Sequence, residues 1–384
     1  MNRPSSHIPL IVGILTRRSL DDPTQPFGRP TTFFAECCIE AARLGVQVVV
    51  FEADDLDPDR PELRGSRFID GSWTEPELMR FPDVVYDRAP LFDPACATSA
   101  NRARFRLIDA GVPFINPLKL LEVAADKLAT YRLLVGHDIT MPATARLDEE
   151  GFAEYRERFG HLFVKPVRGS NGTGVIEVKR EHGLAVVRYG TERVEVKADG
   201  RLWETITALM GNNRSTHGVS LIQQGISTER AGERPFPRFD LRVMMQKDER
   251  KAWGMTGLVA RVSQSDVPTT NLSTGARAEV AEHVLDDVYG PAMRRSIIAS
   301  VTETGLGICQ LLDRDICPCG ELGIDIVTDA AGRPWVIEIN AKPGRSVFKR
   351  IAQSAEVSEE DRQRFAHIRQ RSVAMPFRYA RTLV

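Results

Sequence analysis

Three side chains that carry oxygen lie in a short apolar hairpin near the end of the chain. The segments Leu322 to Thr328 and Trp335 to Ile339 are rich in Ile and Val and are typical of two strands joined by a turn. Because side chains two positions apart on a strand share a face, we expect Glu338 and Asn340 to point the same way. If Asp325 faces them, the three oxygen donors would suit Mg²⁺. The alternative is that both acids are held by backbone amides or an arginine, as most buried charges are.

A lysine followed by a glycine-rich loop is the second pattern that could do chemistry. Lys165 ends a strand-like segment that runs into Arg168-Gly-Ser-Asn-Gly-Thr-Gly174. Three glycines in seven residues predict a flexible loop whose backbone N–H groups can surround phosphate oxygens. A lysine within a buried strand needs an anion nearby. The loop does not have the Walker pattern, since no Gly-Lys-Ser/Thr closes it, and such a hairpin can also be an ordinary turn.

Two further segments are expected to pair as antiparallel strands and carry charges on one face. In Phe239 to Met245, Asp240 and Arg242 alternate with Leu and Val, so the two charges share a face. Its expected partner is Ala252 to Val262, which carries Arg261.

The composition is that of an ordinary folded protein. Of 384 residues, 42% are hydrophobic and 27% are charged, and the formal net charge is −1. Such a charge gives no global field that attracts nucleic acid or an anionic membrane, so we expect neither as a partner. No apolar run approaches the roughly 20 residues that a membrane-spanning helix needs. Six cysteines without the spacing of a disulfide framework or zinc site favour a reducing, cytoplasmic location.

The first 115 residues alternate between strand-like and helix-like segments. Strands are expected at Ile8 to Leu15, Val46 to Phe51, Val84 to Asp87 and Val112 to Ile115, and helices at Thr31 to Leu44 and Ala97 to Ala110. Strand, helix and strand in repetition predict a small parallel α/β domain. No G-x-G-x-x-G follows the first strand, so a dinucleotide site is not supported. After Asn116-Pro117, a single amphipathic helix carrying Lys127 is expected at Leu118 to Val135.

The order of these features resembles the ATP-grasp superfamily of ATP-dependent carboxylate–amine ligases. Within it, the chain is most similar to the spore-coat-associated branch known from endospore formers, with glutamate-adding ligases more distant. The likeness is carried, in chain order, by Lys127, Lys165, the glycine-rich loop, QQGI at 223–226, FDLR at 239–242, Arg261, TNLSTGA at 270–276, LGIDIV at 322–327 and VIEINAKPG at 336–344. It implies an α/β fold with a pre-grasp domain at 1–115, an ATP-grasp domain of two lobes at 116–349 and a helical tail at 350–384.

The resemblance implies a nucleotide site, with ATP as the nucleotide. Lys127 and Lys165 would neutralise the α- and β-phosphates as compact point charges, and Asp240 would lie near the ribose. The loop closing over the β- and γ-phosphates would be Gly169, Ser170, Asn171, Gly172, Thr173 and Gly174. The hinge between the lobes, whose backbone would read the adenine, would be Gln223, Gln224, Gly225 and Ile226.

The resemblance also implies residues for the transferred phosphate, the metal and the substrate. Arg261 and Asn271 would contact the transferred phosphate, and Arg242, on the same strand as Asp240, would lie near the ribose and the phosphates as a further catalytic residue. Asp325, Glu338 and Asn340 would hold one or two Mg²⁺ ions, or Mn²⁺, against the β- and γ-oxygens. Arg345 would hold the carboxylate of the acceptor.

The activity that the resemblance implies is a C–N ligation through an acyl phosphate. A small-molecule or peptide carboxylate would attack the γ-phosphate, and an amine would then displace phosphate from the acyl carbon. Two alternatives stay open at this point. One is an ATP-binding spore or cell-envelope assembly protein with little turnover, and the other is a kinase or phosphohydrolase on the same nucleotide site.

Overall fold

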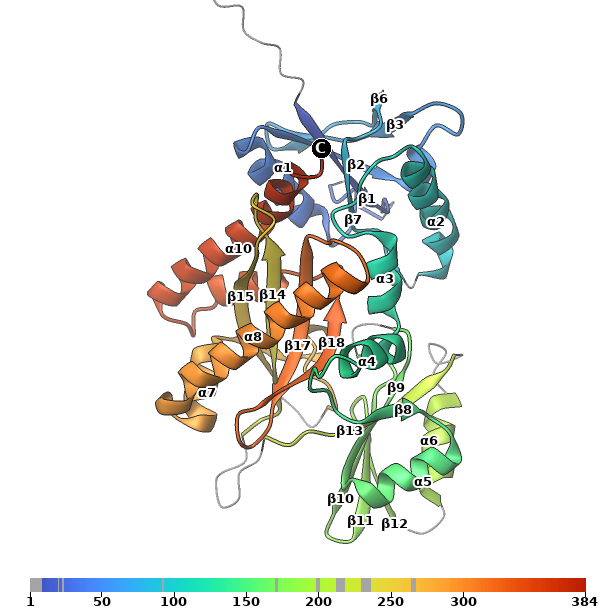
Figure 1. Ribbon diagram of the computed structural model, residues 1–384, viewed down its shortest axis with the longest axis vertical. Helices are drawn as coiled ribbons and strands as arrows, with labels where there is room; N and C mark the ends of the chain where they lie inside the picture. Colours follow the sequence, from blue (N-terminus) through green and yellow to red (C-terminus); the bar gives the residue numbers. More distant parts are fainter. Residues whose placement is uncertain are drawn as a thin grey trace, which may run out of the picture.

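The computed structural model describes residues 9–19, 21–22, 24–91, 93–169, 172–197, 201–211, 218–228, 236–263 and 267–384. They form three parts along the long axis of the molecule: an N-terminal α/β domain, a central five-stranded sheet with helices, and a smaller lobe on a six-stranded sheet (Figure 1). The mixture of helices and strands confirms the predicted α/β class. Within the described ranges, no helix combines the length and the apolar character that crossing a bilayer requires.

Three parallel strands form the sheet of the N-terminal domain, in the order β2-β1-β7. They are β1 (Leu10–Thr16), β2 (Val46–Glu52) and β7 (Val84–Asp87). The strands are buried on both faces, because α1 (Thr31–Arg43) packs on one side and α2 (Pro94–Asp109) on the other. These bounds lie within three residues of the predicted ones. The predicted fourth strand is wrong in extent, since the chain there makes only an isolated parallel bridge between Val85 and Phe114.

Short elements connect β2 to β7. They are η1 (Ala53–Asp55), β3 (Glu62–Gly65), β4 (Phe68–Ile69), β5 (Ser72–Trp73) and β6 (Glu77–Arg80).

The smaller lobe has the strand order β12-β11-β10-β9-β13-β8. Its elements are β8 (Thr144–Arg146), α5 (Glu149–Arg158), β9 (His161–Pro166), β10 (Ile176–Glu181), β11 (Leu184–Tyr189), β12 (Glu192–Lys197), α6 (Arg201–Gly211) and β13 (Ser220–Gln224). Helices α5 and α6 share one hydrophobic core with this sheet. Alternation along β9 places Leu162 and Val164 in that core, while Phe163 and Lys165 line the cavity on the opposite face.

The central sheet has the order β16-β15-β14-β17-β18, all antiparallel. Its strands are β14 (Phe239–Lys247), β15 (Trp253–Val262), β16 (Arg277–Glu279), β17 (Glu321–Thr328) and β18 (Pro334–Asn340), with η3 (Leu272–Thr274) before β16. The predicted hairpin and the predicted pairing of the two charged strands are therefore confirmed. Helices α7 (Ala281–Tyr289) and α8 (Pro291–Asp315) pack on one face.

The two faces of the central sheet differ because its strands alternate. Leu241, Val243 and Ala260 point into the large core under α7 and α8. On the opposite face, α9 (Ser346–Ala352) and α10 (Glu359–Ala380) cover one end of the strands through a second apolar cluster. The other end of that face carries the charged side chains of Asp240, Arg242 and Arg261, which line a cavity.

The helix predicted at 118–135 is broken in two. The structure has α3 (Leu118–Ala125) and α4 (Lys127–Val135), with Asp126 in an extended conformation between them. The Asp126 carboxylate accepts hydrogen bonds from the backbone N–H groups of Leu128 and Ala129, at 3.0 and 2.9 Å, and so caps α4. The apolar periodicity continues across the break, which is why it predicts one helix. The consequence is that Lys127 begins α4 instead of lying in mid-helix.

The C-terminal helix joins the N-terminal domain to the central sheet. Val373, Phe377 and Tyr379 of α10 lie in the same hydrophobic cluster as β1, β2 and α1. Asn116 makes a polar junction, because its amide donates to the carbonyl oxygens of Glu321 (2.8 Å) and Ala341 (2.6 Å). The boundaries 1–115, 116–349 and 350–384 stay a prediction.

Candidate active site

A cavity of about 1410 Å³ extends from the smaller lobe along the open end of the central sheet to the N-terminal domain. It is larger than the ~300–1,000 Å³ typical of a site for one small ligand. It brings together most of the residues singled out in the sequence. These are Lys127, Lys165, Gly169, Gly172, Thr173, Gln223, Gln224, Ile226, Asp240, Arg242, Arg261, Asn271, Asp325, Glu338 and Asn340.

Five of the candidates do not lie in this described lining. Gly174, Gly225 and Arg345 are described by the structure but do not line the cavity. Ser170 and Asn171 lie outside the described residues, so their part of the glycine-rich loop stays a prediction.

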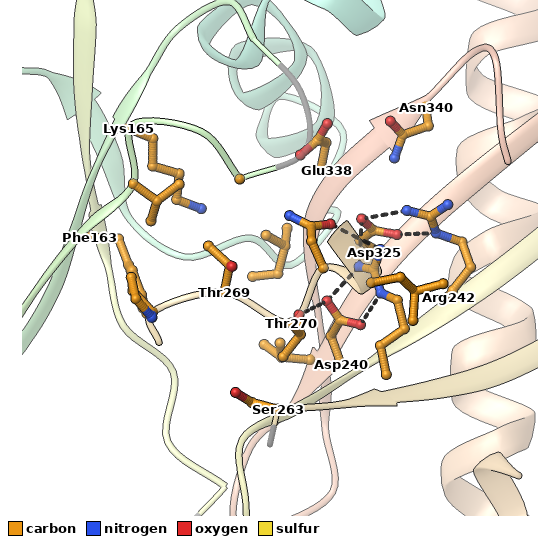
Figure 2. Close-up of a pocket in the computed structure, with 18 of the residues that line it drawn as sticks. Phe163, Lys165, Asp240, Arg242, Ser263, Thr269, Thr270, Asp325, Glu338 and Asn340 are labelled. Atoms are coloured by element: carbon orange, nitrogen blue, oxygen red, sulfur yellow. Dashed lines mark hydrogen bonds and ion pairs between the residues drawn. The ribbon is translucent and has the colours of Figure 1, made fainter. Parts of the chain in front are cut away.

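Charged side chains on three neighbouring strands form a closed network on the cavity floor. Asp240 lies directly opposite Arg261 in the β14–β15 ladder, and Arg242 lies opposite Asp325 in the β14–β17 ladder. Arg261 donates to both carboxylate oxygens of Asp240, at 2.7 and 2.5 Å. Arg242 does the same to Asp325, at 2.5 and 3.0 Å, and Arg261 also lies 2.9 Å from Asp325 (Figure 2).

The pKa values of this network follow from burial and pairing. Burial raises the pKa of Asp325, but Arg242 and Arg261 outweigh it and hold that pKa at about 2. Asp240 has a raised pKa because burial and the charge of Asp325 exceed the opposing effect of Arg261. The pKa of Arg261 is raised, because its two acids outweigh the effect of burial. Asp325 therefore stays ionised, and both arginines keep an aspartate partner.

Glu338 and Asn340 differ from this network because neither has a partner among the residues that the structure describes. A bulge in the β17–β18 ladder pairs Asp325 with Glu338 but Ile326 with Val336, which leaves Ile337 as the extra residue. The bulge turns Glu338 and Asn340 toward the cavity (Figure 2). Neither side chain makes a hydrogen bond or ion pair with any residue in the described part of the chain.

The environment of Glu338 fits a cation. Burial raises the pKa of Glu338, Asp325 raises it further, and Lys127 and Lys165 oppose the increase. Among the described residues there is no cluster of three or more His, Cys, Asp or Glu that could hold a metal alone. Two carboxylates and an amide do suit Mg²⁺, which usually takes one or two carboxylates and completes its shell with phosphate oxygens and water. The donor set therefore fits Mg²⁺ held jointly with a phosphorylated ligand.

The two lysines lie across the cavity from Glu338. The Lys165 ammonium donates to Oε1 of Gln223 at 2.5 Å and lies 5.6 Å from the centre of the Phe163 ring. Burial lowers the pKa of Lys165 to about 8, with Glu338 raising it and Lys127 lowering it. Lys127 donates to the Gly169 carbonyl at 2.9 Å, which ties α4 to the start of the glycine-rich loop.

The glycine-rich loop packs closely on the segment before η3. A Cβ added to Gly172 would lie 2.6 Å from Nδ2 of Asn271 and 2.8 Å from Cγ2 of Thr269. Gly172 also has φ of +70°. Both the contact and the backbone conformation require glycine, so Gly172 allows the chain to approach Thr269 and Asn271 closely.

In the predicted hinge, both glutamine side chains have protein partners. The Gln223 amide bonds Lys165 and also donates to the Thr144 hydroxyl at 3.0 Å. The Gln224 side-chain oxygen accepts from the Ala143 backbone at 3.3 Å. Gly225 packs against the His161 ring, which explains why it does not line the cavity. The glutamines thus support the cavity wall and the position of Lys165.

The YheC/D-like ATP-grasp domain matches residues 111–383. The chain belongs to the YheC/D-like ATP-grasp family. It is 26% identical to the endospore coat-associated protein YheD of Bacillus subtilis over 351 residues, or 89% of this chain and 74% of that protein.

Solved ATP-grasp structures share the fold. A RiPP-associated ATP-grasp ligase of Chryseobacterium gregarium, solved with ADP and a leader and core peptide, is similar over 95% of both chains, with a TM-score of 0.53 and 15% identity. The D-alanine–D-alanine ligase of Bacillus anthracis is similar over 97% of this chain and 99% of that one, with a TM-score of 0.51 and 14% identity. These likenesses confirm the predicted ATP-grasp fold.

Arg345 has a different environment from the one the sequence predicts. Its guanidinium is buried and ion-paired with Glu321, and it donates to the Tyr86 hydroxyl and the Ser372 carbonyl, both at 3.0 Å. Glu321 outweighs burial and raises the pKa of Arg345 above its ordinary value. These bonds join the N-terminal domain, β17 and α10. In this ATP-grasp protein the guanidinium is occupied by structural contacts, and Arg345 lies outside the described lining.

A buried carboxylate beside the cavity, Glu177, is not among the residues that the sequence patterns predict. Glu177 of β10 is fully buried, with its Oε1 2.7 Å from Nε2 of His161 and ion-paired with Arg238. Arg188 lies 3.6 Å from its other oxygen. Burial raises the pKa of Glu177, but its partners outweigh burial and lower it overall. Its partners His161 and Arg238 belong to other segments of the chain, so no local sequence pattern marks Glu177.

Proposed function

We propose that this protein is an ATP- and Mg²⁺-dependent ligase that joins a carboxylate to an amine through an acyl phosphate. One observation carries the proposal: two unpartnered oxygen donors, Glu338 and Asn340, face two lysines and two aspartate-bound arginines across one large cavity. The fold of solved ATP-grasp ligases supports it.

Each residue then has a role that its environment supports. Lys127 and Lys165 bind the α- and β-phosphates, and the glycine-rich loop covers the β- and γ-phosphates. Asp325, Glu338 and Asn340 would hold Mg²⁺, and the bound ion would neutralise negative charge on the phosphates. The adenine lies near the hinge at 223–226, with Asp240 toward the ribose. Arg345, with its buried partners, is not carried forward as a substrate contact.

The chemical steps ask the protein for positioning and charge neutralisation. The substrate carboxylate attacks the γ-phosphorus, the bond to the β,γ-bridging oxygen breaks, and ADP leaves. Arg242 and Arg261, already oriented by their aspartates, stabilise the charge on the transferred phosphoryl group. Asn271 lies 3.5 Å from Nη1 of Arg261 and can orient the same group. The amine then attacks the acyl carbon, phosphate leaves, and the amine loses a proton.

The relatives support a second candidate, an ATP-binding protein of spore or cell-envelope assembly with little turnover. Its basis is the coat-associated description of YheD. The donors Glu338 and Asn340, which have no partner among the described residues, favour the ligase, because binding ATP alone does not require free donors beside Arg242 and Arg261. The six free cysteines are compatible with the proposed cytoplasmic location.

The test is release of ADP and phosphate from ATP over a panel of amino acids and short peptides, with and without an added amine. Amine-dependent release supports a ligase. Nucleotide binding without release favours the assembly protein, and a stable phosphorylated product would instead indicate a kinase.

A further inference from the structure

One end of the cavity carries positive charge that the nucleotide does not require. Beyond Asn340, the lining continues through Lys342, Gly344 and Ser346 to Arg350 of α9, and the N-terminal domain adds Arg29 and Arg88. We call the four basic residues Arg29, Arg88, Lys342 and Arg350 the cationic end. In the described lining, no acidic side chain comes from the N-terminal domain or from the segment after Asn340.

Two buried acids, Glu321 and Asp87, lie near this end, and each is ion-paired with two basic side chains. Glu321 is ion-paired with Arg345 and also with Arg88, whose Nη1 lies 3.5 Å from its Oε1. That Nη1 is buried and has no hydrogen-bond partner in the described part of the chain. Asp87 is shared between Arg104 at 2.7 Å and Lys342 at 2.6 Å. Each acid therefore leaves one positive charge uncompensated.

The two remaining arginines have no partner at all in the described ranges. Arg29 and Arg350 are both exposed on the cavity, one from the loop before α1 and the other from α9. Arg88 is anchored nearby, because its guanidinium donates to the Pro343 carbonyl at 3.2 Å and lies 5.5 Å from the centre of the Phe33 ring in α1. The exposed guanidinium groups of Arg29 and Arg350, from two separate parts of the chain, are thus available to a ligand, and Arg88 adds positive charge beside them.

We infer that the substrate of this site is an acidic one, which carries at least one oxyanion group in addition to the carboxylate that is activated. The inference rests on the proposed function, since it places the reacting carboxylate beside Arg242 and Arg261 and the second group at the cationic end. A guanidinium binds carboxylates and phosphates through paired hydrogen bonds, so either group satisfies the chemistry. The volume of the cavity leaves room for such a substrate beside a nucleotide.

The experiment measures binding without turnover. The full chain is saturated with Mg²⁺ and a non-hydrolysable ATP analogue, and calorimetry then compares matched probes: triglutamate against triglutamine, L-glutamate against L-glutamine, and O-phosphoserine against serine. For at least one pair we expect the anionic probe to bind about tenfold or more tightly, with the preference falling as salt is raised. The carboxylate and phosphate pairs identify the source of the oxyanion.

Variants then assign the preference to the cationic end. The double substitution Arg29→Ala with Arg350→Ala should reduce the preference for the anionic probe by about tenfold, because it removes two positive charges from the cationic end. Exposure of both arginines to solvent limits the size of the effect. The matched control is Arg295→Ala, an exposed arginine of α8 outside the described lining, which should leave the preference unchanged. Affinity for the ATP analogue should change by less than about threefold in all variants, since the phosphates bind at the lysines.

Two results would overturn the inference: no preference for any anionic probe in the wild-type protein, or a full preference in the double variant. Neither depends on turnover. If the anionic probes bind as expected but none supports release of ADP in the presence of an amine, the ligase proposal fails while the acidic ligand stands.

Discussion

Two regions of the same cavity differ in whether their charged side chains are paired with one another. On the floor, Asp240, Arg242, Arg261 and Asp325 satisfy one another through paired hydrogen bonds. At the edge strand, Glu338 has a raised pKa and no partner among the described residues. A closed network holds its members in place before any ligand arrives, whereas an unpartnered carboxylate gains a partner only when a ligand binds. We therefore predict that substitutions in the network on the cavity floor lower both the free energy of unfolding and the rate of turnover. Substitution of Glu338 should lower the rate alone.

The largest expected effect is at the edge. Glu338→Gln should abolish turnover, because a neutral amide holds Mg²⁺ poorly. The melting temperature should stay within a few degrees of wild type, since Glu338 makes no ion pair with any described residue that the substitution could remove. Substrate-dependent release of ADP and thermal unfolding are the two measurements. Undiminished activity would contradict the metal assignment.

Arg261→Ala should affect both properties. We expect a loss of rate on the order of 10²-fold or more, from removal of a charge at the transferred phosphoryl group. Removing the shared partner of two buried aspartates should also cost about 3–5 kcal/mol in the free energy of unfolding. Denaturant unfolding in parallel with kinetics tests this, with Arg295→Ala as the control. A variant that loses rate but keeps full stability would show that the floor is not a closed network.

Gly172→Ala should weaken nucleotide binding by roughly tenfold, because its Cβ would meet Asn271 and the residue has φ of +70°. Gly183→Ala is the matched control, since Gly183 has φ of +83° but nothing within 4 Å of an added Cβ. Both variants carry backbone strain, but only the first disturbs the cavity. Equal losses of ATP affinity in the two would argue against the close packing as the cause.

The smallest effect concerns pH. Burial lowers the pKa of Lys165 to about 8. The side chain is therefore positively charged below pH 8, and it loses its proton and its charge as the pH rises above that value. The negative charge of bound phosphates favours the protonated form of Lys165. Nucleotide binding should therefore be accompanied by proton uptake near pH 8 to 9, and the affinity should fall at higher pH. Calorimetry in buffers of different ionisation enthalpy measures this uptake. Lys165→Met should bind ATP more weakly and show none of this proton uptake.

Much of the site could be predicted from local patterns. Alternation along β14 puts Asp240 and Arg242 on one face, and the apolar hairpin of β17 and β18 identifies Asp325, Glu338 and Asn340 as unusual oxygen donors. The glycine-rich loop beside Lys165 is equally readable. These features depend on residues close in the chain, so their spacing contains the information.

Other features depend on contacts between distant segments and could not be predicted in that way. The alternative that acids in the hairpin pair with arginines holds for Asp325 and not for Glu338, and only the register of β14 against β17 decides which. The break at Asp126 follows from a side-chain cap that the apolar periodicity does not reveal. Glu177 is recognised as a residue beside the site only from its contacts with His161 of β9 and Arg238 before β14, which are distant in the sequence or on another strand.

Residue types and their order along the chain define the chemistry available to this protein: an α/β chain with two lysines, a glycine-rich loop and oxygen donors on strands, in the order of an ATP-grasp protein. Which of those groups stay free for a ligand depends on how the chain folds. The tertiary structure occupied Arg345 and Asp325 with protein partners, left Glu338 and Asn340 open, and gathered Arg29, Arg88 and Arg350 at one end of the cavity. The physical reason is that residue type sets what a side chain can bind, while burial and strand register set whether another side chain has already bound it.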